Sequence, residues 1–69
     1  MPDAYTWQIR LRRRGELEPR LVETRQEARK PQLLETINLR LPDGPAVRAM
    51  IVHLTFISPS TYAVTANEV

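Results

Sequence analysis

Residues 7–16 read WQIRLRRRGE, in which four arginines fall within five positions and a glycine follows them. Around this stretch, apolar and polar side chains alternate. The apolar set is Tyr5, Trp7, Ile9 and Leu11, and the polar set is Thr6, Gln8, Arg10 and Arg12. A period of two is typical of a strand with one buried face. We therefore expect a strand that begins near residue 5 and carries Tyr5 and Trp7 on its core face.

Gly15 predicts that a hairpin follows this strand. A three-residue loop at 13–15 would place the glycine in the left-handed conformation that closes such loops. The resulting register pairs Trp7 with Leu21, Leu11 with Leu17, Arg10 with Glu18 and Arg12 with Glu16. A one-residue slip would set Leu11 against Glu18 and turn the apolar set of one strand to the wrong face. In this register the strand arginines face carboxylates, and only Arg13 and Arg14 stay free.

The next stretch, RLVETRQEARK at 20–30, is ambiguous between strand and helix. Its composition favours a helix, but its apolar stripe is thin and like charges recur at helical spacing. We expect a strand to about residue 24 followed by a polar loop, with a short helix at about 20–30 as the alternative. Pro19 cannot donate to a ladder, so this strand is expected at a sheet edge or with a bulge.

A second hairpin is predicted around PDG at 42–44, by the same argument from proline, aspartate and glycine in a tight loop. The register pairs Leu39 with Val47, Asn38 with Arg48, Ile37 with Ala49 and Leu34 with Val52. The strand that follows, at 46–57, is apolar on both faces in its middle, and we expect it to be central. A turn at 58–61 precedes a last strand, containing Tyr62 and Val64, whose register the residues leave open.

Five short strands predict one all-β domain over 1–69, an SH3-like barrel or a curled antiparallel meander. The alternative is an α+β fold with a short helix at about 20–30. A chain of 69 residues has a small core and no cysteine to reinforce it. The longest apolar run, at 46–57, is interrupted by Arg48 and His53, so we expect a cytoplasmic protein with no membrane segment.

No catalytic, cofactor-binding or metal-binding residue is expected, and we do not expect an enzyme. His53 is the only histidine, and neither cysteine nor a neighbouring carboxylate accompanies it. The hydroxyls of Ser58, Ser60 and Thr61 have no positioned base in sequence. The carboxylates that could supply acid–base chemistry look like solvated strand positions: Glu16, Glu18, Glu23 and Glu35.

Two binding functions remain. The leading hypothesis is a protein-interaction module with an unidentified partner, a homodimer being a candidate, through the apolar surplus of Met50, Val52, Leu54 and Phe56. The alternative is a nucleic-acid-binding barrel that uses a basic hairpin tip and its surroundings, namely Arg13, Arg14, Arg20, Arg25, Arg29 and Lys30. The alternative ranks second because Tyr5 and Trp7 are expected inside, which leaves few aromatic side chains for base stacking.

Overall fold

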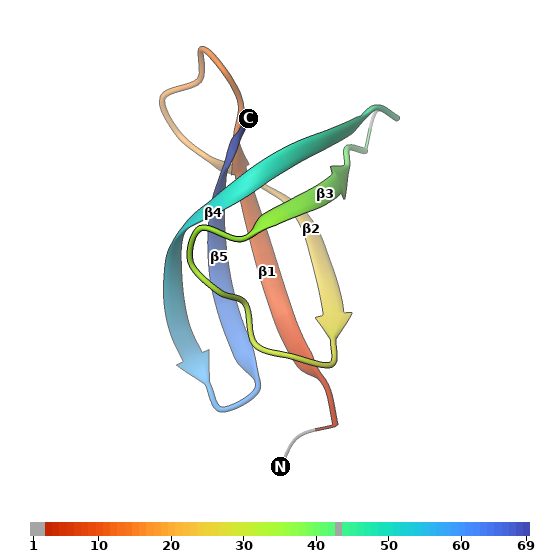
Figure 1. The fold of residues 1–69 in the computed structure, drawn as a ribbon, viewed down its shortest axis with the longest axis vertical. Helices are drawn as coiled ribbons and strands as arrows, with labels where there is room; N and C mark the ends of the chain where they lie inside the picture. Colours follow the sequence, from red (N-terminus) through yellow and green to blue (C-terminus); the bar gives the residue numbers. More distant parts are fainter. Residues whose placement is uncertain (1–2, 43) are drawn as a thin grey trace.

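The computed structural model of the chain describes residues 3–42 and 44–69. Five strands form one sheet in the order β2-β1-β5-β4-β3 (Figure 1). Their bounds are β1 Tyr5–Arg12, β2 Arg20–Glu27, β3 Thr36–Arg40, β4 Ala46–Ser58 and β5 Thr61–Glu68. The all-β prediction is confirmed. The helical alternative at 20–30 is wrong because β2 occupies most of that stretch, and β2 runs three residues beyond the expected end at 24. No helix long and apolar enough to cross a membrane occurs in the described ranges.

The middle strand of the sheet is β5, and not β4 as expected. β5 pairs with β1 in parallel and with β4 antiparallel, so both of its edges are occupied. Its inward residues Val64 and Ala66 are fully buried. β4 lies one place from the edge, and β3 covers only its first half, over residues 46–50. The long apolar sequence of β4 therefore does not mark the centre of the sheet, and three of its apolar side chains, Val52, Phe56 and Ile57, are exposed.

The second hairpin forms in the predicted register over the residues nearest its loop. Leu39 pairs with Val47, Asn38 with Arg48 and Ile37 with Ala49. Gly44 has a φ of +114°, which fits the closing position of the loop, while Asp43 lies outside the described residues. The expected pairing of Leu34 with Val52 does not form. Instead Leu34, with a φ of +67°, donates its backbone N–H to the carbonyl oxygen of Ile51 at 2.7 Å.

The first hairpin differs from its predicted register. Leu11 pairs with Arg20 instead of Leu17, and Trp7 pairs with Arg25 instead of Leu21. Gly15 does take a positive φ of +86°, in a turn where Glu16 donates its N–H to the carbonyl oxygen of Arg13. The chain then continues outward through Pro19 before the ladder resumes, which leaves Leu17 92% exposed. The predicted pairs of Arg10 with Glu18 and Arg12 with Glu16 are consequently wrong.

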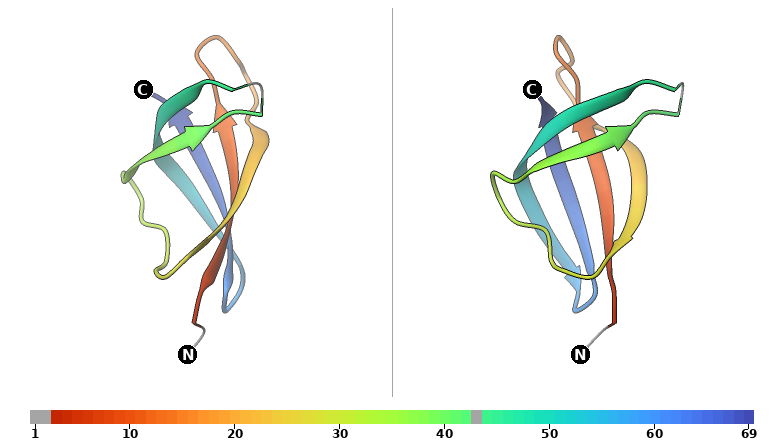
Figure 2. Two further views of the ribbon diagram at one scale, coloured as in Figure 1. Left: turned by 90° about the vertical axis from the view of Figure 1, so that its right-hand side faces the viewer. Right: turned by 45° about the vertical axis from the view of Figure 1, so that its right-hand side comes forward.

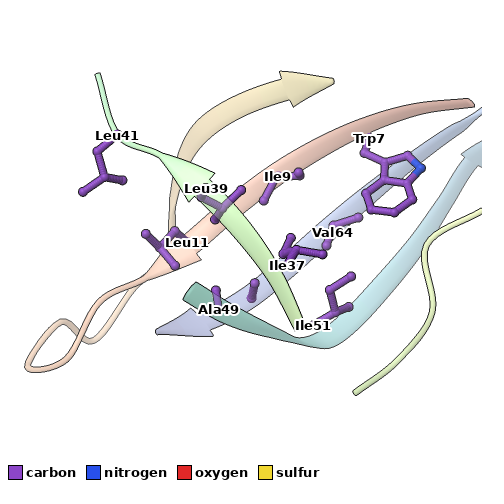
Figure 3. Packing of buried hydrophobic residues seen from close by; sticks show 10 residues of the cluster. Trp7, Ile9, Leu11, Ile37, Leu39, Leu41, Ala49, Ile51 and Val64 are labelled. Carbon is purple, nitrogen blue, oxygen red and sulfur yellow. The ribbon is translucent and has the colours of Figure 1, made fainter. Parts of the chain in front are cut away.

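The sheet curls so that β3 and the first half of β4 cross in front of β1 and β5 (Figure 2). The core lies in the enclosed space (Figure 3). It consists of Trp7, Ile9, Leu11, Ile37, Leu39, Leu41, Ala49, Ile51, Val64 and Ala66.

β2 is an edge strand, as Pro19 predicts, and its ladder with β1 shifts register at Val22. β2 and β3 do not pair, but a guanidinium nitrogen of Arg25 donates to the carbonyl oxygen of Asn38 at 2.8 Å across the gap.

Candidate functional site

The six basic residues predicted to meet an anion do not form one surface. Arg13 and Arg14 lie in the β1–β2 loop at one end of the molecule (Figure 1). Arg20 and Arg25 belong to β2, and Arg29 and Lys30 lie in the loop at 28–35, toward the opposite end. The structure thus separates residues that the sequence grouped by proximity.

Four of the six are held in ion pairs with carboxylates. Arg13 pairs with Glu68, Arg20 with Glu16, Arg25 with both Glu23 and Glu27, and Arg29 with Glu35. Most of these contacts are partly exposed and each contributes about 0–1 kcal/mol to folding. They nevertheless neutralise the positive charge locally. Arg13, which was expected to be free, is one of the paired residues.

The Arg29–Glu35 pair closes the loop at 28–35. Both guanidinium ends contact the carboxylate, one nitrogen donating to Oε1 at 2.8 Å, and the N–H of Gln32 reaches the same oxygen at 3.3 Å. The hydrogen bond from Arg29 lowers the pKa of Glu35 below its usual value, against a smaller opposing effect of burial. The same bond raises the pKa of Arg29. The pair acts as a clasp on the loop that covers Trp7.

Among the described residues, Arg14 has no side-chain ion pair, and four strand arginines lack one as well. Among residues 3–42 and 44–69, Arg10, Arg12, Arg40 and Arg48 have no carboxylate within ion-pairing distance. All four are strand residues that alternate with core residues, so they point to the convex outer side of the sheet. Ladder neighbours confirm this placement, because Arg10 pairs with Thr65 and Arg12 with Asn67, next to buried Val64 and Ala66.

The convex face as a whole carries no acidic strand residue in the described ranges. On β1 and β5 its other members are neutral, mainly Thr6, Gln8, Thr61, Thr65 and Asn67. On β4 and β3 it continues through His53, Met50 and Thr36. The acids of β2 face the concave side, since Glu23 pairs with Ile9 and Glu27 with Tyr5. Sequence reasoning missed this face because the incorrect hairpin register matched Arg10 and Arg12 with carboxylates.

The predicted interface residues Met50, Val52, Leu54 and Phe56 do not share one face. The β4–β5 register shifts between Ile51 and His53, which leaves Val52 unpaired in a bulge, and it shifts again beyond Phe56. Met50 consequently lies on the convex side, whereas Leu54 packs against the core on the concave side. Phe56 lies on the concave side as well, 63% exposed and edge-on to Tyr62 with ring centroids 5.8 Å apart.

Beyond Ile51, β4 has an open edge. The loop at 32–35 is still hydrogen-bonded to Ile51, whose backbone N–H donates to the backbone carbonyl oxygen of Glu35 at 2.8 Å. Over residues 53–56 no described strand lies on the outer side of β4 (Figure 1). Exposed apolar side chains accompany this backbone, namely Leu34, Val52, Phe56 and Ile57. We refer to residues 53–56 with these side chains as the open edge of β4.

The remaining polar candidates are dispersed. His53 is exposed on the convex side, and no group of three metal-ligating side chains occurs within the described parts of the chain. Ser58 ends β4 and Thr61 begins β5, as the predicted turn requires. Of the four candidate carboxylates, Glu16, Glu23 and Glu35 are engaged in the ion pairs above, while Glu18 lies exposed in the β1–β2 loop.

No protein-family model, no curated protein and no solved structure matches this chain. Two surfaces of the curled five-stranded sheet stand out: the uncharged open edge of β4 and the basic convex face.

Proposed function

We propose that the chain is a protein-interaction module that associates with a second copy of itself along the open edge of β4. The supporting observation is that residues 53–56 present strand backbone to solvent without the charged side chains or proline that often protect an edge. The stretch HLTF contains no lysine, arginine, acid or proline. Bulges at Val52 and Ile57 bound it, so the regular pairing segment is four residues long.

A second copy suits this edge because antiparallel pairing of identical strands is self-complementary about a two-fold axis. Four residues of ladder alone bury much less than the roughly 1,200 Å² of a stable interface. The exposed side chains of Leu34, Val52, Phe56 and Ile57 supply the further area. Dimerisation would remove these side chains from water, and this burial of apolar surface would be the main favourable contribution to association. The contribution matters in a chain with so small a core.

The test is Phe56→Lys, measured by sedimentation equilibrium over a range of protein concentrations. We expect the natural chain to show a monomer–dimer equilibrium and the variant to stay monomeric, because the added charge would have to be buried in the interface. Leu17→Lys is the matched control: it replaces an exposed apolar residue and adds the same charge in the β1–β2 loop, far from this edge.

Two results would overturn the proposal. One is a natural chain that stays monomeric at millimolar concentration. The other is an equal loss of association in Leu17→Lys, which would show that added charge alone disfavours contact. Amide hydrogen exchange provides the spatial check, since protection at residues 53–56 should rise with protein concentration while protection in β2 stays constant.

A further inference from the structure

We propose that the convex face binds the phosphodiester backbone of a nucleic-acid duplex, with Arg10, Arg12 and Arg48 as the contacting cations. This site lies outside the open edge of β4 and does not depend on self-association. It also differs from the basic hairpin tip that the sequence suggested, where Arg13 and Arg20 are each paired with a carboxylate.

The charge of the convex face favours a polyanionic ligand. The chain has a net charge of only +2, but the five acids in ion pairs lie on the concave side or in loops. The convex strand positions are left with arginine and no acid in the described ranges. Between the arginines stand hydroxyl and amide side chains, such as Thr65 and Asn67, which are common donors to phosphate oxygens.

The spacing of the arginines supports a duplex. Arg10 and Arg12 are two residues apart on β1, about 6.6 Å along the strand. Arg12 is in register with Asn67 and Met50, two strands away, and Arg48 lies two residues beyond Met50. Measured along the sheet, which curls at this corner, these steps separate the Arg12 and Arg48 positions by about 12 Å. The major groove of a duplex is also about 12 Å wide between its phosphate walls, so a convex basic surface can reach both.

The aromatic residues argue against a single strand. Trp7 is buried, and Tyr5, Tyr62 and Phe56 form a cluster on the concave side. The convex face of β1 and β5 contains no aromatic residue on which a base could stack. Binding would then be governed by charge density, which is higher along a duplex than along a single strand.

Arg12 contributes a second observation. The Nε atom of Arg12 and the Oδ1 atom of Asn67 are buried and have no hydrogen-bond partner. The two residues are neighbours across the β1–β5 ladder. Covered polar atoms are rarely left unbonded. A turn of the Arg12 side chain toward a phosphate oxygen would give its Nε–H the acceptor that it lacks in the free protein.

The experiment measures fluorescence anisotropy of a labelled mixed-sequence DNA duplex as the natural chain and variants are added at several salt concentrations. The main variant is R10Q/R48Q, because both side chains are exposed. We expect its affinity to fall about tenfold or more, and the slope of log K against log salt to shrink by about two. The single variant R12Q should shrink the slope by about one, with its melting temperature recorded to show that it folds.

The matched control is R20Q/K30Q, which lowers the net charge equally but acts on residues away from the convex face. It should leave the salt slope unchanged. Equal loss in both double variants, or no duplex binding at low salt, would overturn the proposal. So would equal binding of a single strand, heparin or phosphatidylserine vesicles, since each would show a general attraction to anions. F56K should keep its duplex binding, which separates this site from the open edge of β4.

Discussion

The indole Nε1 of Trp7 donates a hydrogen bond of 3.0 Å to the backbone carbonyl oxygen of Arg29, and the Arg29 guanidinium carbon lies 5.1 Å from the centroid of the Trp7 ring. Arg29, in the loop at 28–35, thus contacts the Trp7 side chain through both its backbone carbonyl group and its guanidinium group. These contacts, with the buried Pro31, hold the loop against the core.

Replacement of the indole should reveal how much this anchor stabilises the fold. We expect Trp7→Phe to lower the free energy of unfolding by about 1–3 kcal/mol, because it removes the donor and leaves the Arg29 carbonyl oxygen poorly satisfied. Urea denaturation followed by far-UV circular dichroism measures the change. Arg29→Gln keeps the backbone bond and loses only the cation and its ion pair, so it should cost less. A larger cost for Arg29→Gln would contradict this account.

The clasp between Arg29 and Glu35 should make stability depend on pH in the acid range. The folded pKa of Glu35 is lowered from an ordinary value of 4.5, so the clasp stabilises the fold at neutral pH. This contribution is lost as the pH falls below about 4.5 and through the lowered folded pKa. The difference in unfolding free energy between the natural chain and Glu35→Gln should therefore shrink from pH 7 toward pH 3. Glu18→Gln, with the same charge change, should not show this pattern.

The bridge from Arg25 to Asn38 should hold the gap between β2 and β3. Arg25→Met would remove the donor to the Asn38 carbonyl oxygen and leave Glu23 and Glu27 without the cation between them. We expect a loss of about 1–2 kcal/mol in urea denaturation. Arg25→Lys keeps the charge but lacks the planar fork, so it should lose an intermediate amount. Full stability of Arg25→Met would show that the gap needs no bridge.

The two glycines should differ in their tolerance of alanine. No heavy atom outside the neighbouring residues lies within 4 Å of a Cβ built on Gly15 or Gly44, so backbone conformation alone sets the cost. The φ of +86° at Gly15 is nearer the left-handed region than the +114° at Gly44. We expect Gly15→Ala to cost about 1 kcal/mol and Gly44→Ala to cost more. Thermal denaturation of both variants tests the order, and an inverted order would contradict it.

The sequence predicted the strand register of one hairpin better than that of the other. The second was predicted correctly from Ile37 to Val47, because its loop is short and each strand of the pair buries alternate residues on the same side. In the first, Gly15 took the expected conformation, yet the ladder did not continue from it. A local match of Leu11 with Leu17 was outweighed by contacts to a strand far along the chain, including those of Arg13 and Arg14 with Glu68.

The concave side of β2 shows why that match misled. An amphipathic strand pattern is informative when one face meets the core and the other meets water. β2 lies at the edge of a curled sheet, where its inward face meets the gap to β3. Arg25 and its two carboxylates fill those positions, whereas Leu21 pairs with Arg10 and lies exposed on the convex side. Apolar alternation within a hairpin carries no information about such a gap.

By itself the sequence determined the all-β class, the strand at β1 with Trp7, Ile9 and Leu11 buried, and the strand pairing of the second hairpin. These features depend on side-chain alternation and on residues that favour particular turns, which act over a few neighbouring positions. Tertiary structure alone decided the parallel pairing of β5 with β1, the bulge at Val52 and the arginines left without carboxylates. Those outcomes depend on which distant segments meet when the sheet curls, and each strand accepts more than one neighbour of suitable polarity.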